Sequence, residues 1–340
     1  MLADPRRYGP GDPSNPLLQL AVAPPSAELA HALRELAAAG RDAEIAAVLA
    51  AAPSQVLYAR LWQALCAAIE KPHAEQGVAP RVFAIAWVIV CGASMAATLP
   101  CVLPDVSGLA RVLESHGVFG ASRNLGLSNA LCSIESLESL APSTALKWSR
   151  MSEPRDAPPA PIHAARGAEE VHVRFLLGAA IAPAEAPGVI ETGADIGRWG
   201  TPALRAMTAQ LAMPGVQILA MPRPPAGLYS AAYWGRRAGI EAAFNLFTSN
   251  AVRRFRMALG DPVATLSSHA GGELRVTLAT PLDDALTEGF RWPLHPADEL
   301  QDLQRTIAAL IAECGLAEPH IAPAVLPDYT SSGALLFPVA

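Results

Sequence analysis

The feature that most constrains the fold is an uncharged, apolar segment that covers residues 82–104. It is long enough to cross a bilayer as a helix, which takes about 20 apolar residues. Its β-branched and aromatic residues stop at Cys91, however, and Gly-Ala-Ser, a turn-like sequence, follows. Pro100 and Pro104 would break a helix near its end. We therefore expect a buried strand at 82–90, and a single-span membrane subunit using 82–104 is the alternative.

Charge and composition bound the class of protein. The chain has 31 acidic and 25 basic residues, a net charge of −6, and a pI of about 5.8. Proteins that bind nucleic acid or anionic membranes are normally basic, so we expect neither partner. Hydrophobic residues make up 51% of the chain, which is enough apolar surface to exclude global disorder. A length of 340 residues predicts two domains.

Proline content and helical periodicity suggest where the chain divides. Three amphipathic segments lie between residues 26 and 71, and four prolines fall within ten residues from Ser152 to Pro161. Such a proline-rich stretch favours an extended linker. We predict these parts: an extended arm at 1–25, a helical cap at 26–80, a first α/β half at 81–151, a linker at 152–168, a second α/β half at 169–327 and a C-terminal tail at 328–340.

The second half shows a recognisable order of elements. We expect strands at 171–181, 216–221, 263–269, 273–280 and 321–326, with helices from Thr201, over 229–259 and over 298–314. If the helix at 229–259 is an insertion, this order matches the ferredoxin-like split βαβ plan, in which helices cover one face of an antiparallel sheet. The expected fold class is therefore α/β (α+β), with a helical cap before two α/β halves.

Motifs for the common chemistries are missing. The chain has no Walker sequence, no G-x-G-x-x-G after a strand, no G-x-S-x-G, no C-x-x-C and no H-E-x-x-H. We therefore expect no cofactor and no metal site. The number of cysteines is odd, at five, and their spacing is loose, which favours buried free thiols in a reducing compartment. Because the N-terminus also lacks a secretory signal, we expect a cytoplasmic protein.

A thiol at a strand end is the one position that suggests an enzyme. Cys91 precedes Gly92 at the end of the expected strand, and a nearby histidine could activate it. His172, His269 and His320 lie in or beside strands of the second half and could converge. An enzyme would then have its site in the cleft between the two α/β halves. Buried structural residues are the competing interpretation.

Basic and aromatic residues gather on the long helical segment at 229–259. The candidate binding residues are Tyr233, Trp234, Arg236, Arg237, Arg253, Arg254 and Arg256. Arginine and aromatic side chains dominate binding surfaces, so this segment could bind an acidic partner or a phosphate. The alternative is an ordinary amphipathic helix whose aromatics face inward and whose arginines face water.

Two short segments near the C-terminus carry a family resemblance. Trp292-Pro293-Leu294 follows a strand, and Pro327-Asp328-Tyr329 precedes Ala334-Leu-Leu-Phe-Pro338. These segments, with Leu131-Cys-Ser-Ile-Glu-Ser-Leu137, resemble a family of uncharacterised β-proteobacterial proteins. In that family a cysteine pair precedes the L-F-P segment, whereas Thr330-Ser331-Ser332 stands here. The family has no established activity, so the resemblance implies a bacterial protein but no mechanism.

These observations together favour a non-enzymatic interaction or accessory protein of a bacterial cytoplasmic complex. We expect a protein partner or a homo-oligomer. The alternatives are an enzyme of unrecognised type and the single-span membrane subunit.

Overall fold

The chain folds into two compact units, Met1–Gly239 and Ile240–Ala340, called here the N-terminal and C-terminal units. The computed structural model describes residues 15–22, 27–70, 78–116, 118–119, 122–154, 158–167, 169–183, 196–219, 225–258, 260–269, 272–280, 283–322, 328 and 336–337. Helices and strands occur in both units, which confirms the mixed α/β class.

A small helical bundle opens the N-terminal unit, as predicted for residues 26–71. It consists of α1 (Pro16–Val22), α2 (Ala27–Ala38), α3 (Asp42–Ala50), α4 (Gln55–Glu70) and, from later in the chain, α7 (Pro142–Trp148). Their apolar faces meet in one core, which includes Leu29, Leu33, Ile45, Leu61 and Leu65.

The first helix corrects the predicted extended arm at 1–25. Leu17, Leu18 and Ala21 bury one face of α1 in the bundle core, so residues 16–22 are helical. Arg60 of α4 donates hydrogen bonds to the carbonyls of Ala21 and Val22, which satisfies the end of α1. The rest of that arm lies outside the described residues.

The uncharged segment forms the central strand of a four-stranded antiparallel sheet. β1 (Val78–Cys91) lies between β5 (Glu170–Pro183) and β6 (Val216–Leu219), and β3 (Arg123–Ser133) pairs with the other edge of β5. The predicted strand at 82–90 is confirmed. Within the described part of the chain, no helix is long and apolar enough to cross a membrane.

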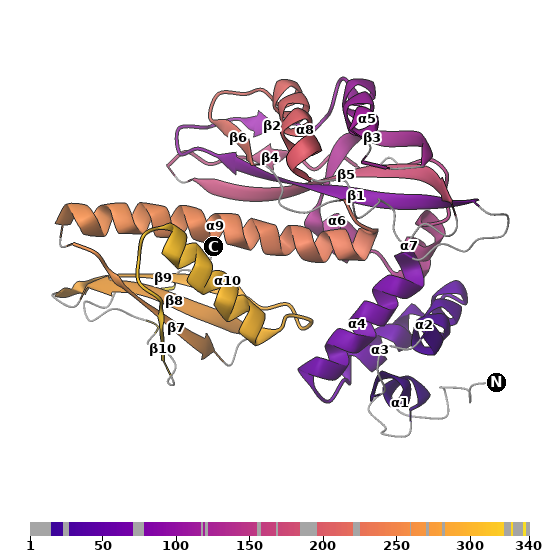
Figure 1. Ribbon diagram of the computed structural model, residues 1–340, viewed down its shortest axis with the longest axis horizontal. Helices are drawn as coiled ribbons and strands as arrows, with labels where there is room; N and C mark the ends of the chain where they lie inside the picture. Colours follow the sequence, from indigo (N-terminus) through magenta and orange to yellow (C-terminus); the bar gives the residue numbers. More distant parts are fainter. Residues whose placement is uncertain are drawn as a thin grey trace. The chain divides into compact units, whose positions relative to one another are not determined.

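Helices cover both faces of this sheet (Figure 1). On one face, α5 (Val106–Ser115) and α8 (Ile196–Gln210) pack against alternate residues of β1 and β5. On the other face lie α6 (Ile134–Glu138) and the first part of α9 (Leu228–Ala258). Burial on both faces explains why the middle of β1 is apolar at every position, without polar alternation.

The sheet corrects the predicted division into two α/β halves. β1 and β3 belong to the predicted first half and β5 and β6 to the second, yet all four strands form one sheet. The stretch at 152–168 is therefore a connection within a unit, and it contains β4 (Ile162–His163), which pairs with β2 (Thr98–Leu99). The two predicted halves, between which the enzyme alternative placed its site, are therefore not separate bodies.

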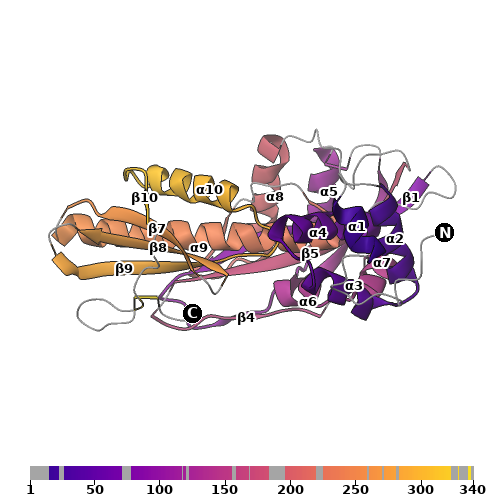
Figure 2. The ribbon, with the colours of Figure 1, turned by 90° about the horizontal axis from the view of Figure 1, so that it is seen from below.

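The C-terminal unit contains a second four-stranded sheet, in the order β10-β7-β8-β9. These strands are β7 (Val263–His269), β8 (Glu273–Thr280), β9 (Asp283–Pro293) and β10 (His320–Ile321). The latter part of α9 and α10 (Leu300–Glu313) pack on one face around Phe244, Phe255 and Trp292. Figure 2 shows α10 beside the strands β7, β8 and β9.

The ferredoxin-like order predicted for 169–327 is therefore wrong. Its first two strands join the sheet of the N-terminal unit, and its other three join the sheet of the C-terminal unit. The helix treated as an insertion is α9, and the boundary between the two compact units falls within it, after Gly239. The long strand β9 was not predicted, because acidic residues and Gly289 interrupt its apolar pattern.

Candidate functional site

The predicted basic and aromatic residues all lie on α9, but they fall into two groups. Tyr233, Trp234, Arg236 and Arg237 belong to the N-terminal unit, whereas the three arginines from Arg253 to Arg256 belong to the C-terminal unit. The structure therefore does not assemble all seven residues into one site within a compact unit.

The C-terminal arginines bind groups of their own unit. Arg254 forms a two-pronged ion pair with Glu288 of β9, with Nε 2.8 Å from Oε1, and this hydrogen bonding raises the pKa of Arg254. Arg256 donates to Asp261, and Arg253 donates to Asn250. The contacts of Arg254 and Arg256 fasten α9 to β9 and to the following loop, whereas that of Arg253 lies within α9. This arrangement is the one that the amphipathic-helix alternative predicts.

The N-terminal group is a compact aromatic and cationic cluster. The rings of Tyr233 and Trp234 meet edge-on with centroids 4.7 Å apart, and the Arg237 guanidinium carbon lies 5.9 Å from the Trp234 ring centroid. All three side chains are half-buried. Arg236 instead forms a two-pronged ion pair, in which its Nε and Nη2 donate to the two carboxylate oxygens of Glu138 in α6. We call Tyr233, Trp234 and Arg237 the α9 cluster.

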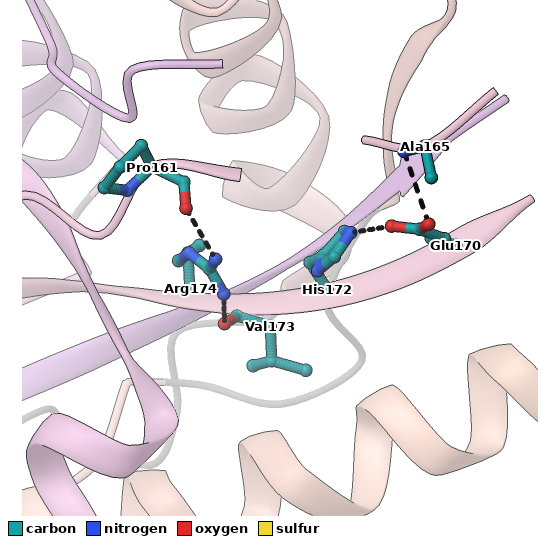
Figure 3. Close-up of polar contacts among 6 residues, drawn as sticks. All are labelled: Pro161, Ala165, Glu170, His172, Val173 and Arg174. Carbon is teal, nitrogen blue, oxygen red and sulfur yellow. Dashed lines mark hydrogen bonds and ion pairs between the residues drawn. The ribbon is translucent and has the colours of Figure 1, made fainter. Parts of the chain in front are cut away.

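A second polar group lies at the start of β5. Glu170, His172 and Arg174 alternate with valines, so the three side chains share the face of the sheet that α5 and α8 cover (Figure 3). We did not predict this row as a unit, although the sequence alternates polar and apolar residues from Glu170 to Arg174.

The first two members of the row form a carboxylate–imidazole pair. His172 Nε2 lies 3.0 Å from Glu170 Oε2, and the two side chains point toward each other (Figure 3). Burial lowers the pKa of His172, and the contact with Glu170 opposes this shift only in part. The imidazole is therefore neutral at pH 7 and can hold or transfer a proton.

Arg174 binds backbone carbonyls in place of a carboxylate. Its side chain donates to the carbonyls of Ala160 at 2.7 Å, Val173 at 2.9 Å and Pro161 at 3.3 Å. It therefore fixes the connection that leads into β4 against the start of β5. Trp87 of β1 is its direct cross-strand neighbour on the same face.

The thiols beside this row are protonated at neutral pH. Cys91 pairs across the strands with Glu170, two residues from His172, so the structure brings a histidine near the predicted nucleophile. Burial raises the pKa of Cys91, and the Glu170 carboxylate raises it further. Burial also raises the pKa of Cys101, although Arg174 lies beside its sulfur. A thiol that stays protonated is a poor nucleophile.

The other predicted histidines do not join this group. His269 lies on β7 and His320 on β10, both in the C-terminal unit. Among the residues that the structure describes, no three histidine, cysteine or acidic side chains are grouped so that they could hold a metal ion.

Comparisons with known proteins add no identification: no family model, no curated protein and no solved structure matches the chain. The resemblance to the β-proteobacterial family therefore stays a prediction. Of its quoted segments, Trp292 is buried against Phe244 and Phe290, and Phe337 is buried as well. Thr330, Ser331 and Ser332 lie outside the described residues.

Proposed function

We propose that this chain is a non-enzymatic interaction or accessory protein of a bacterial cytoplasmic complex, and that the α9 cluster is its contact surface. The supporting observation is the cluster itself: a tryptophan that contacts both a tyrosine and an arginine, with all three side chains only half-buried. These three residue types are the ones most enriched at the energetic centres of protein interfaces.

The chemistry of the cluster points to the partner. Arginine over a tryptophan ring is a combination that recognises carboxylates beside an apolar surface, because a guanidinium carries several donors and the ring favours a cation over its face. The partner is therefore a protein that presents an acidic side chain beside an apolar one. A second copy of this chain is the alternative occupant.

Two further observations support a non-enzymatic, cytoplasmic role. Burial raises the pKa values of both thiols near His172, so neither is an activated nucleophile, and Arg174 donates to carbonyls of its own chain, so its guanidinium serves the fold. All five cysteines are free, and four of them are buried, which fits a reducing compartment.

The test is a comparison of co-purifying proteins from the cells that make the chain. The double variant Trp234→Ala/Arg237→Ala removes the cluster, and Arg305→Ala on α10, whose side chain is 76% exposed, is the matched control. We expect one partner to be retained in fixed ratio by the wild-type chain and by the control. If the cluster contributes about 2 kcal/mol to the binding free energy, its removal in the double variant should weaken binding roughly 30-fold.

Three outcomes would contradict the proposal. The double variant could keep the partner, or the wild-type chain could purify alone as a monomer. Turnover of a metabolite by the purified chain that is lost in His172→Gln would favour the enzyme alternative. If the wild-type chain is a stable homo-oligomer and the double variant is a monomer, the partner that binds the cluster is a second copy of the chain.

A further inference from the structure

The sheet of the C-terminal unit has a polar face that is largely buried. Leu274, Val276 and Leu278 of β8 point toward α9 and α10, so the alternate residues of that strand point away from both helices. Arg275 and Thr277 lie on this second face, and so does Ser267 of β7. All three are buried, which is unusual for an arginine without a role.

Three residues form a row across this face. Ser267 lies directly opposite Arg275, which lies directly opposite Arg291 of β9. Neighbouring strands are about 4.8 Å apart, so the side chains of Arg275 and Arg291 leave the sheet from adjacent positions. Like charges directly opposite each other destabilise a sheet unless anions balance them.

Arg275 has its balancing anions within the chain. Its Nε donates to Glu273 at 2.8 Å, its Nη1 donates to Asp328 at 2.5 Å, and its guanidinium carbon lies 4.6 Å from the centroid of the Phe337 ring. The charge of this arginine is therefore compensated by described carboxylates.

Arg291 has no such carboxylate among the described residues, and the buried hydroxyl of Ser267 has no hydrogen-bond partner there. The buried Nε of Arg291 likewise has no hydrogen-bond partner in the described part of the chain. A buried polar atom without a partner destabilises the folded state, so folded proteins seldom keep one without a ligand or water to satisfy it. Two such atoms in one row indicate a place for a ligand.

We propose that this row is a binding site for a small oxyanion, either a carboxylate or a phosphate group. The ligand accepts a hydrogen bond from Arg291 Nε and a second from the Ser267 hydroxyl, and its charge balances the second arginine of the row. Both atoms are free to act as donors, and a guanidinium is suited to planar, two-pronged recognition of such oxygens. This site is independent of the α9 cluster and of the partner proposed there.

The test is titration of the full-length chain with inorganic phosphate and, separately, with acetate, followed by calorimetry and thermal unfolding. Sodium chloride at matched ionic strength is the control for general salt effects. We expect saturable binding of at least one probe, and the probe that binds more tightly identifies the phosphate or the carboxylate as the natural group. The same probe should raise the melting temperature.

Variants assign the binding to the row. Arg291→Gln should weaken binding at least 10-fold, and Arg291→Lys should weaken it less, because lysine keeps the charge but not the Nε donor. Ser267→Ala removes a single donor and should weaken binding several-fold without unfolding the chain. Arg305→Gln on α10 should leave binding unchanged. Equal binding by Arg291→Gln and the wild-type chain, or no saturable binding of either probe, would overturn the proposal.

Discussion

At the scale of single residues, the carboxylate of Glu70 is placed where a helix begins. Glu70 ends α4, and its two oxygens accept hydrogen bonds from the backbone nitrogen of Ser230, at 2.8 Å, and from its hydroxyl, at 2.7 Å. The first backbone N–H groups of α9 have no partner within the helix, so Glu70 supplies an acceptor from another element. This contact fastens the helical bundle to the start of α9.

Glu70 should make stability depend on pH. Burial raises the pKa of Glu70 above the ordinary value of 4.5, although the hydrogen bonds from Ser230 oppose the shift. Between 4.5 and the raised pKa, the folded state therefore holds more protons than the unfolded state, and stability falls as pH rises. In Glu70→Gln this loss should be absent, so the variant should gain stability relative to wild type as pH rises from 4 to 7. Urea unfolding across that range measures the difference, and a constant difference would refute the prediction.

A glycine of α9 provides a second test at this scale. A Cβ atom on Gly235 would lie 2.5 Å from Cζ of Phe175, a buried ring of β5. Replacing a helical glycine by alanine normally stabilises by up to about 1 kcal/mol. Here we expect Gly235→Ala to destabilise by about 1–3 kcal/mol, because the ring must move within a packed core. Chemical unfolding checks this, and Gly197→Ala on the exposed side of α8 is the control that should not destabilise.

At the scale of elements, local pattern predicted individual helices and strands better than it predicted their partners. The helices between 26 and 71 and the strand at 82–90 followed from periodicity, because each signal lies within a few turns or residues. The pairing of β1 with β5 joins segments far apart in the sequence, and nothing in either strand specifies the other. Proline content at 152–168 suggested a domain boundary, whereas carbonyls of that stretch bind Arg174.

The same reasoning applies to the candidate sites. The α9 residues were found from composition, since arginines and aromatics are conspicuous in a helix. Their division between two units was not predictable, because a helical pattern does not show which domain each turn contacts. Ser267, Arg275 and Arg291 come from three strands, and only the strand register brings them into one row.

Arg174 links β5 to the stretch at 152–168, so replacing it tests how that stretch is held. Removing its guanidinium leaves the carbonyls of Ala160 and Pro161 without their donor, so Arg174→Gln should destabilise the chain by about 1–3 kcal/mol. His172→Gln, on the same face of β5, is the matched control and should cost less. Limited proteolysis should also cut Arg174→Gln faster at residues 152–168. Unchanged cleavage there would show that Arg174 does not hold the segment.

At the scale of the whole molecule, each compact unit has its own core and should lose stability separately. The core around Val276 in the C-terminal unit shares no residues with the core around Leu176 in the N-terminal unit. We expect Val276→Ala to destabilise its unit by about 2 kcal/mol and to speed hydrogen exchange in β7, β8 and β9, with little change in β1 and β5. Leu176→Ala should show the reverse pattern. Equal acceleration in both units by either variant would indicate a single cooperative unit.

The order of pairing in the N-terminal sheet has a consequence for synthesis on the ribosome. Both neighbours of β1 come later in the chain, since β5 begins at Glu170 and β6 at Val216. At ~5–20 residues per second, the roughly 80 residues between the end of β1 and the start of β5 take about 4–16 s to make. Throughout that time a nascent chain carries its most apolar strand with both edges open. Newly made chains of this protein should therefore depend on chaperones that shield such strands, and release of chains truncated before residue 170 should produce aggregates.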